Sequence, residues 1–260
     1  MLINAKQLKG LTIRASDGEL GTVDEFYFDD QTWGIRYLVV DTASWLAGRR
    51  VLIAPYSILH ADWQARRLDV GLTMKQVENS PDIDTRLPVS RQHESEYLAY
   101  YGYPYYWNGP DFWSAGYSPV AVTDPVLVNA AGEDMILKNP MDIHLRSSNS
   151  VTGHYLEALN GEIGHVDGFV LDDESWSIRY VEIATRNWWP GKKVLVSPAW
   201  ITRISWEASK MYASVSRELV QSAPEYLEDV PVTRGYENQL YFHYGQSPYW
   251  LGLKDPNLPL

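Results

Sequence analysis

Alternating apolar and polar residues predict that most of the chain forms short β-strands. In Ile35–Thr42 and in Ile178–Thr185, apolar residues recur at every second position, as in a strand with one face in a core. The second segment carries Glu182 where the first carries Val39, so this position belongs to the face that tolerates polar residues. The positions predicted to point inward are Leu38, Val40, Val181 and Ile183.

Turn and helix signals divide the rest of the first half of the chain into further elements. The polar run Asp29–Thr32 predicts a hairpin turn after a strand at about Thr22–Phe28. Pro55 is expected to end the next strand, because proline cannot donate a backbone hydrogen bond. A second hairpin is expected over Ile58–Leu72, and a capping box at Thr73–Gln76 predicts a short helix after it.

The chain contains an internal duplication. The segment from Gly18 matches the segment from Gly161, a shift of 143 positions, and the match continues without a gap to Trp107 and Trp250. About 31 of about 90 aligned positions are identical, over a period too long for a stacked solenoid unit. We therefore expect two copies of one domain, each with its own core.

The predicted fold class is mainly β, with two small β-barrels, each followed by a short helix and an aromatic-rich arm. We place the first barrel with its arm at residues 1–107 and the second at residues 144–260. Residues 108–143 are a connector of low charge, with the composition of a short hairpin around Ala130–Gly132. Because duplicated domains commonly reproduce a dimer interface, we expect the barrels to pack as an intramolecular pseudo-dimer.

Charge and composition exclude several classes of function. The chain has 22 Lys and Arg against 33 Asp and Glu, and its net charge of −11 argues against a nucleic-acid partner. It has no cysteine, which excludes disulfides, thiolate metal sites and cysteine nucleophiles. It has no apolar run typical of a signal peptide or a transmembrane segment, so we expect a soluble, cytoplasmic protein.

The repeated sequence resembles the PRC-barrel family over about Leu2–Pro88 and about Leu145–Pro231. The likeness rests on a G-x-L/I-G-x-V element, an Asp-Asp turn, a strand that ends before proline and the hairpin ADWQARRLDVGLT. The family is typified by the cytoplasmic domain of the photosynthetic reaction-centre H subunit and by the C-terminal domain of a 16S rRNA maturation factor. The resemblance implies a bacterial barrel that docks on a larger assembly. Its glycines here are Gly10, Gly18, Gly21, Gly153, Gly161 and Gly164.

The ionisable residues show no recognisable catalytic motif. The six histidines have no metal-binding spacing, and no nucleophile elbow, phosphate loop or dinucleotide fingerprint occurs, so we expect neither an enzyme nor a cofactor. Arg91 with Glu94, and Arg234 with Glu237, have the spacing of a helical salt bridge. The weak candidates for a hard cation are Asp29, Asp30, Asp172 and Asp173, whose alternative role is to hydrogen-bond within turns.

The aromatic residues, which include 11 Trp and 18 Tyr, are the best candidates for a binding surface. The alternative, which we favour for most of them, is that each arm packs onto a barrel. Some of the candidates are tryptophans in loops beside basic pairs, a setting that also allows peripheral membrane association. The candidates are Trp45, Tyr101, Tyr106, Trp107, Trp188, Trp189, Tyr244, Tyr249 and Trp250.

The leading functional hypothesis is a non-enzymatic scaffold that docks on another, unidentified protein. One alternative is a peripheral accessory of a photosynthetic or respiratory membrane complex. The other is a protein that binds a carbohydrate or another small ligand in an aromatic cleft, which requires a deep pocket with converging polar groups.

Overall fold

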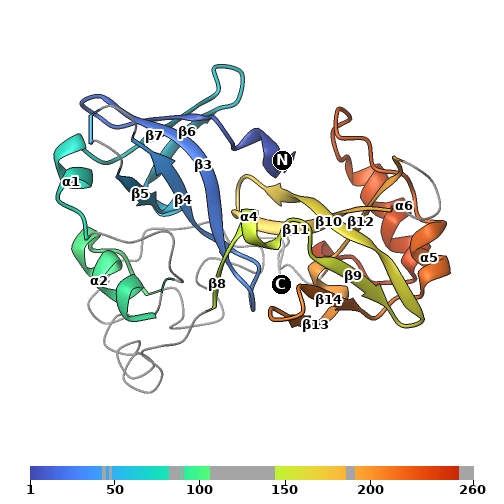
Figure 1. Ribbon diagram of the computed structural model, residues 1–260. Coiled ribbons are helices and arrows are strands. Elements are labelled where there is room, and N and C mark those ends of the chain that lie inside the picture. The colour runs from blue at the N-terminus through green and yellow to red at the C-terminus, as the bar shows by residue number, and fades with distance from the viewer. Residues whose placement is uncertain are drawn as a thin grey trace, which may run out of the picture. The chain divides into compact units, whose positions relative to one another are not determined.

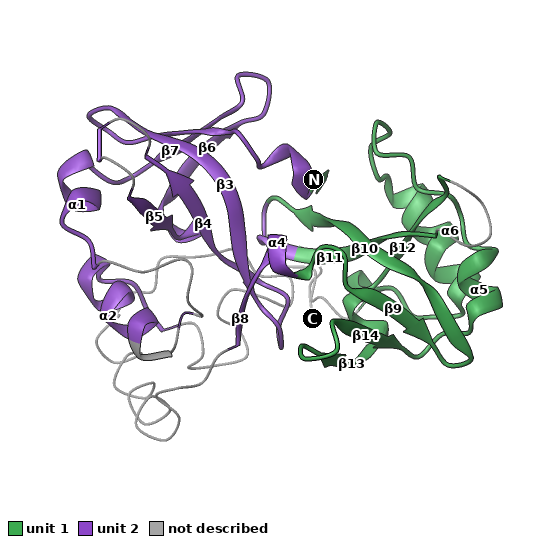
Figure 2. Cartoon of the chain, in the orientation of Figure 1, with its two compact units in different colours: residues 1–4, 151–173, 178–260 green, residues 5–150, 174–177 purple. Residues whose placement is uncertain are grey.

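A computed structural model of the chain describes residues 1–42, 45–46, 49–81, 89, 91–105, 144–185 and 191–251, and of Arg91 and Gln92 it describes the backbone. The predicted mainly β fold is confirmed, in the form of two compact units (Figure 2). Unit 1 comprises Met1–Asn4, Val151–Asp173 and Ile178–Leu260, and unit 2 comprises Ala5–Ser150 and Glu174–Ser177.

Unit 2 is built on a seven-stranded sheet with the order β5-β4-β3-β2-β7-β6, and β8 pairs with β3 (Figure 1). The pairing of β2 with β7 is parallel, and the other pairings are antiparallel. The elements are η1 (Ala5–Gln7), β2 (Thr12–Arg14), β3 (Glu19–Asp29), β4 (Ile35–Asp41), β5 (Arg50–Ile53), η2 (Pro55–Ser57), β6 (Ile58–Asp62), β7 (Arg67–Val70), α1 (Met74–Glu78), α2 (Arg91–Tyr101) and β8 (Leu145–Ser147).

Unit 1 repeats this arrangement, with the order β12-β11-β10-β9-β14-β13 and with β1 on β10. Neither order returns to its first strand among the described residues, so hydrogen bonding leaves both sheets open where we expected closed barrels. The elements are β1 (Leu2–Asn4), β9 (Tyr155–Ala158), β10 (Gly161–Asp172), β11 (Ser177–Ala184), β12 (Lys193–Val196), η4 (Pro198–Trp200), β13 (Ile201–Ser205), β14 (Lys210–Ala213), α5 (Arg217–Gln221), α6 (Arg234–Tyr244) and η5 (Tyr249–Leu251). In the short helix α4 (Ser148–Val151), residues 148–150 belong to unit 2 and Val151 belongs to unit 1.

The two sequence copies exchange their first strands. β1, from the first copy, pairs with β10 in unit 1 and places Ile3 opposite Leu171. β8, from the second copy, pairs with β3 in unit 2 and places Arg146 opposite Phe28. The two pairings have the same register, because each residue pair in one becomes a residue pair of the other when equivalent positions, 143 residues apart, are interchanged. The compact units and the sequence copies therefore differ at β1 and β8, which we call the exchanged strands.

The backbone of the two copies repeats even at unusual conformations. Trp33 and Trp176, which end the two acidic turns, both have positive φ angles, of 58° and 52°. Arg66 and Ser209, in the later hairpins, have φ angles of 52° and 50°. Residues other than glycine rarely adopt this region, so its recurrence at equivalent positions is independent support for the duplication.

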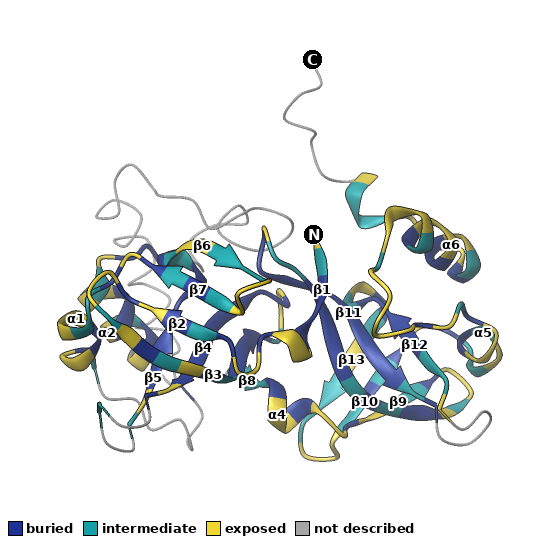
Figure 3. Ribbon diagram, turned by 90° about the horizontal axis from the view of Figure 1, so that it is seen from above, coloured by how far each residue is buried: buried dark blue, intermediate teal, exposed yellow. Residues whose placement is uncertain are grey.

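Both faces of the central strands are buried (Figure 3). The four positions predicted to point inward have no exposed surface. Val39 and Glu182 are also 0% exposed, so the face that tolerates a polar residue is buried as well. In unit 2 this second face is covered by the arm, because Val39 belongs to one hydrophobic cluster with Tyr97 and Leu98 of α2.

The predicted helices and turns are confirmed in their local chemistry. Thr73 and Gln76 form the capping box that starts α1, and the Oγ of Ser216 caps α5. β5 ends two residues before Pro55, as expected. Each arm then begins with an eleven-residue helix, and in unit 2 the hydroxyl of Tyr97 donates a hydrogen bond to the carbonyl of Leu52, 2.8 Å away.

Gly21 of β3 lies close to the backbone of β4, and a substitution there tests this packing. A Cβ atom at Gly21, whose φ is +139°, would lie 2.0 Å from the carbonyl oxygen of Asp41. We expect Gly21→Ala to lower the free energy of unfolding by about 3 kcal/mol, because it adds a clash with backbone to an unfavourable φ. The matched control is Gly153→Ala, which also has a positive φ but meets nothing within 4 Å. It should cost only about 1 kcal/mol in urea unfolding, and equal losses for the two variants would contradict this packing.

Candidate functional site

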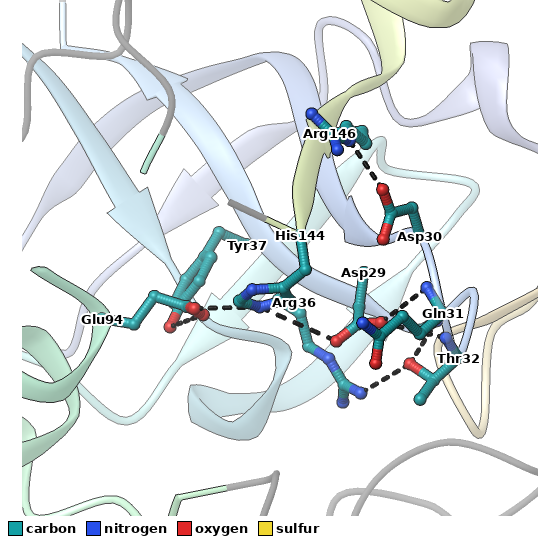
Figure 4. A network of polar contacts seen from close by, with 10 residues as sticks. Asp29, Asp30, Gln31, Thr32, Arg36, Tyr37, Glu94, His144 and Arg146 are labelled. Atoms are coloured by element: carbon teal, nitrogen blue, oxygen red, sulfur yellow. Dashed lines mark hydrogen bonds and ion pairs between the residues drawn. The ribbon is translucent and has the colours of Figure 1, made fainter. Parts of the chain in front are cut away.

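The main polar site of unit 2 lies where the exchanged strand β8 meets β3 (Figure 4). His144, directly before β8, is 1% exposed. Its Nε2 lies 3.0 Å from Oε2 of Glu94 in α2 and 3.7 Å from Oδ2 of Asp29 at the end of β3. The imidazole therefore links three separate segments of the unit, namely β8, α2 and β3.

Glu94 is fully buried and has a second partner in Tyr37 of β4. The Tyr37 hydroxyl donates a hydrogen bond to Oε1 of Glu94 over 3.2 Å. Burial raises the pKa of Tyr37 well above its usual value, and the charge of Glu94 raises it further. The hydroxyl therefore stays protonated and remains a donor to the carboxylate at neutral pH.

Asp29 forms the hydrogen-bonded turn that the sequence predicts. Its Oδ1 accepts hydrogen bonds from the backbone N–H groups of Gln31 and Thr32, both at 2.9 Å. Asp29 is only 3% exposed, whereas Gln31 and Thr32 of the same turn are exposed. Burial raises the pKa of Asp29, but the charges of Arg36 and His144 and the two N–H groups outweigh this effect and lower it overall.

The next carboxylate, Asp30, contacts the exchanged strand directly. Nε of Arg146 in β8 lies 2.7 Å from Oδ2 of Asp30. Burial raises the pKa of Asp30, and Arg146 offsets only part of that rise. Removal of Arg146 would therefore leave a partly buried carboxylate that is costly to ionise.

The equivalent site of unit 1 keeps the tyrosine donor to the carboxylate and differs in the other partners. Glu237 accepts hydrogen bonds from the hydroxyls of Tyr180, at 2.7 Å, and Tyr249, at 3.1 Å. The predicted salt bridge of Glu237 with Arg234 is confirmed at 2.9 Å. Met1 stands at the sequence position equivalent to His144, so the imidazole is specific to unit 2.

A second polar cluster in unit 1 surrounds Lys193 of β12. One carboxylate oxygen each from Asp167, Glu182 and Glu228 lies within 4.8 Å of the others. Nζ of Lys193 is 2.5 Å from Asp167 and 2.7 Å from Glu182, and it also contacts Glu228. Burial lowers the pKa of Lys193, but hydrogen bonds to the three carboxylates outweigh this and hold it above its usual value.

The exchanged strand β1 ends on this Lys193 cluster. Nδ2 of Asn4 donates hydrogen bonds to Oε2 of Glu182, at 3.1 Å, and to the hydroxyl of Tyr226, at 3.0 Å. Glu182 is thus held by a cation from its own sheet and by an amide from the exchanged strand. Comparison of the two sequence copies singles out Glu182, but it does not identify Asn4, which lies 178 positions away in the chain.

The carboxylates that we considered as cation ligands already have cations of the protein beside them. Asp172 lies 3.2 Å from Nη2 of Arg179, and Asp173 contacts the amino group of Met1. Asp29 and Asp30 have the partners described above. The Lys193 cluster has the oxygen donors that hard cations prefer, but the ammonium group lies among them. These carboxylates form internal ion pairs, and those of Asp30 and Asp173 join the exchanged strand β8 and the residue before β1 to their sheets.

The aromatic candidates that the structure describes are packed against their own units. Nε1 of Trp45 donates to the carbonyl of Leu20 at 2.7 Å, and Tyr101 stacks on Tyr103 with ring centroids 5.4 Å apart. The placements of Tyr106, Trp107, Trp188 and Trp189, and of the whole connector 108–143, lie outside the described residues.

In the arm of unit 1, three candidates pack around α6. Tyr244 is buried with its ring centroid 4.4 Å from that of Trp200. Trp250 meets Tyr241 edge-on at 5.2 Å, and the guanidinium of Arg179 lies 4.4 Å from the ring centroid of Tyr249. Most of the aromatic area at these positions therefore stabilises the arm, in line with the reading that we favour.

Sequence reasoning missed His144, Tyr37 and the burial of Glu94. One signal was available, because Arg36, Tyr37 and Glu94 all recur at the equivalent positions of the second copy. The contact of His144 could not be found in this way, since its equivalent is Met1 and its partner lies in the other sequence copy.

Comparison with known proteins identifies one domain family. The family model of the PRC-barrel domain matches residues 2–70, which begin with β1 and end with β7. A search of curated proteins finds no match to the chain. No helix in the described part of the chain is long and apolar enough to cross a membrane.

The Lys193 cluster gives a test of the internal ion pairs. We expect Lys193→Met to lower the free energy of unfolding by about 3 kcal/mol, because it leaves the buried carboxylate of Glu182 without its cation. The matched control is Arg50→Met at the equivalent position of unit 2. Arg50 is 45% exposed and pairs with Asp24 over 3.0 Å, so its loss should cost less than about 1 kcal/mol. Similar losses in urea unfolding would contradict the assignment.

The packed arms predict a loss of stability at high pH. Burial raises the pKa of Tyr101 and that of Tyr249 from 10.0 to about 12. Below pH 10 both the folded and the unfolded chain keep these protons, so the stabilisation is complete. Between pH 10 and about 12 the unfolded chain loses them first, so the free energy of unfolding should fall. Urea unfolding across this range measures the fall, which should be smaller in Tyr249→Phe, and a constant free energy would show that these hydroxyls are not buried.

Proposed function

We propose that this chain, whose residues 2–70 belong to the PRC-barrel domain family, is a non-enzymatic module that binds another protein. The family supports a generic module, and the site supports a structural role for its ionisable groups. Glu94 and His144 are at most 1% exposed and contact each other, which is an arrangement that fastens strands. A partner must therefore be bound by other, exposed residues.

The observation that carries the proposal is an exposed phenylalanine on α6. Phe242 is 90% exposed, although Leu240, Tyr241 and Tyr244 on the same helix are buried. The equivalent residue of α2 is Ala99, which is also exposed. An exposed phenylalanine of this kind adds little to the stability of the fold and favours association, and the copy in unit 2 shows that the fold does not require it.

Other exposed apolar residues lie on the same unit. Leu227 and Val230, in the segment that leads into α6, are 55% and 54% exposed. The hydroxyl of Tyr236 in α6 donates to the carbonyl of Pro224, which fixes this segment beside the helix. We therefore place the contact surface on α6 and residues 227–230 of unit 1, which we call the α6 surface.

The packed aromatic residues give this surface a rigid support. Trp250 and Tyr244 pack on the side of α6 that faces its unit, so they position Phe242 without contacting a partner themselves. Rigid presentation of an apolar side chain reduces the entropy lost on binding. The net charge of −11 favours a protein partner over nucleic acid, and a cytoplasmic location remains part of the proposal.

Affinity purification after cross-linking, from cells that express the protein, tests the α6 surface. We expect one stoichiometric partner with the wild type and at least a tenfold lower yield with Phe242→Ala, because buried aromatic anchors at interfaces contribute about 2 kcal/mol or more. The variant should stay as stable as the wild type, since the side chain is exposed.

The matched control is Leu59→Ala in unit 2, which removes an apolar side chain that is 76% exposed. This variant should retain the partner in full. Equal recovery with Phe242→Ala would refute the α6 surface, and recovery of no specific protein by the wild type would refute the scaffold function. In the second case, a membrane complex or a small ligand would be the next class of partner to test.

A further inference from the structure

The exchanged strands are each matched to one acceptor edge by their side chains. β8 brings Arg146 to Asp30 and Ser147 to Glu25, and His144 before it contacts Glu94. These contacts pair two basic side chains and a hydroxyl with carboxylates of unit 2. The edge of β3 is thus completed by a strand of complementary charge.

The strand β1 has different chemistry and fits the other edge. It carries Ile3 and Asn4 at the positions equivalent to Arg146 and Ser147. Ile3 is 5% exposed against β10, and Asn4 donates to Glu182. If β1 paired with β3, Ile3 would stand in the place of Arg146 and leave Asp30 without that cation, and Asn4 would stand in the place of Ser147 beside Glu25.

The loss of the Arg146–Asp30 ion pair disfavours the direct arrangement in unit 2. In unit 1 the residue equivalent to Asp30 is Asp173, which contacts the amino group of Met1, and Ile3 there is only 5% exposed. Because the pairing of β1 with β3 is unfavourable, the edge gains a specificity for its strand. Backbone hydrogen bonds alone could not give a three-residue strand this specificity. The edge of unit 2 therefore distinguishes β8 from β1 through the Arg146–Asp30 pair.

These contacts do not depend on the two partners belonging to one chain. The match to a PRC-barrel domain covers residues 2–70, so the domain sequence itself begins with the strand that unit 1 receives. Each edge is thus completed by a segment from another domain copy. Within one molecule, the high effective concentration of the second copy favours the internal pairing, but a second molecule offers the same residues.

We propose that the edge of unit 2 formed by Tyr27–Asp30 and Glu94 is a selective binding site for residues 144–147 of a second copy of this chain, so that two molecules pair by strand exchange. Arg146 and Asp30 determine the selectivity. Their side chains are 22% and 13% exposed, and the 2.7 Å ion pair between them joins the incoming strand to the acceptor. Domain exchange of this kind needs no interface beyond the one already present in the monomer.

A charge reversal divided between two full-length proteins tests this pairing. In Arg146→Glu, the new carboxylate faces Asp30, and in Asp30→Arg, the new guanidinium faces Arg146, so each variant repels its own strand. When the two variants are unfolded together in urea and refolded as a mixture, one exchanged site regains the native pair and the other gains the reversed pair. We expect at least about ten times more dimer in the mixture than in either variant alone, because both partly buried pairs are restored only in trans.

The matched control is the double variant Asp30→Arg/Arg146→Glu in one chain, which restores the pair internally and should stay monomeric. Light scattering gives the mass, and native mass spectrometry shows whether each dimer contains one copy of each variant. A mixture that stays monomeric while both variants are folded overturns the proposal. Equal dimer formation by a single variant also overturns it, since the Arg146–Asp30 pair would then not control the exchange.

If a single variant fails to fold, the mixture still decides the question by complementation. Circular dichroism should then show folded protein in the mixture only, and an unfolded mixture beside a folded double variant contradicts the proposal. A second measurement needs no substitution. Wild-type chains with heavy and light isotopes, refolded together at high concentration, should yield mixed dimers, and their absence at every concentration contradicts the proposal.

Discussion

The structure depends on how the free edge of the longest strand in each unit is completed. A strand edge presents backbone N–H and C=O groups that need partners, and an open edge invites aggregation. β2 covers the start of β3, through Thr12–Arg14, but the end of β3 at Tyr27–Asp29 is left for another strand. The protein fills this gap with β8 from the other sequence copy, and β1 fills the same gap on β10. Neither sequence copy completes its own sheet.

This exchange explains where the polar residues are buried. His144, Arg146 and Asn4 all lie on or beside the exchanged strands, and their partners are carboxylates of the accepting unit. A buried carboxylate is costly unless a cation or several donors hold it, so the exchanged strands stabilise the carboxylates of the edges that they complete. The buried polar residues at the exchanged strands therefore help to determine which strand completes each sheet. In the function that we propose, exposed apolar residues such as Phe242 contact the partner.

Local patterns in the sequence predict the elements well and the long-range pairing poorly. The capping box at Thr73, the Asp29 turn and the strand end before Pro55 depend on neighbouring residues, and all three are present. The duplication identifies the positions that recur, including Glu237 and its salt bridge. It cannot show the exchange, because a three-residue strand has the same pattern whichever copy it pairs with. Burial of Glu182 was missed for a related reason, since its partner Asn4 belongs to the other copy.

The most direct test of the exchange is a nuclear Overhauser measurement between backbone protons of facing strands. The account predicts contacts of Ile3 with Leu171 and of Arg146 with Phe28, the facing residues of the two antiparallel pairs. Contacts of Ile3 with Phe28, and of Arg146 with Leu171, would instead show that each copy keeps its own first strand. That result would contradict the exchange and the role that we assign to the buried polar residues.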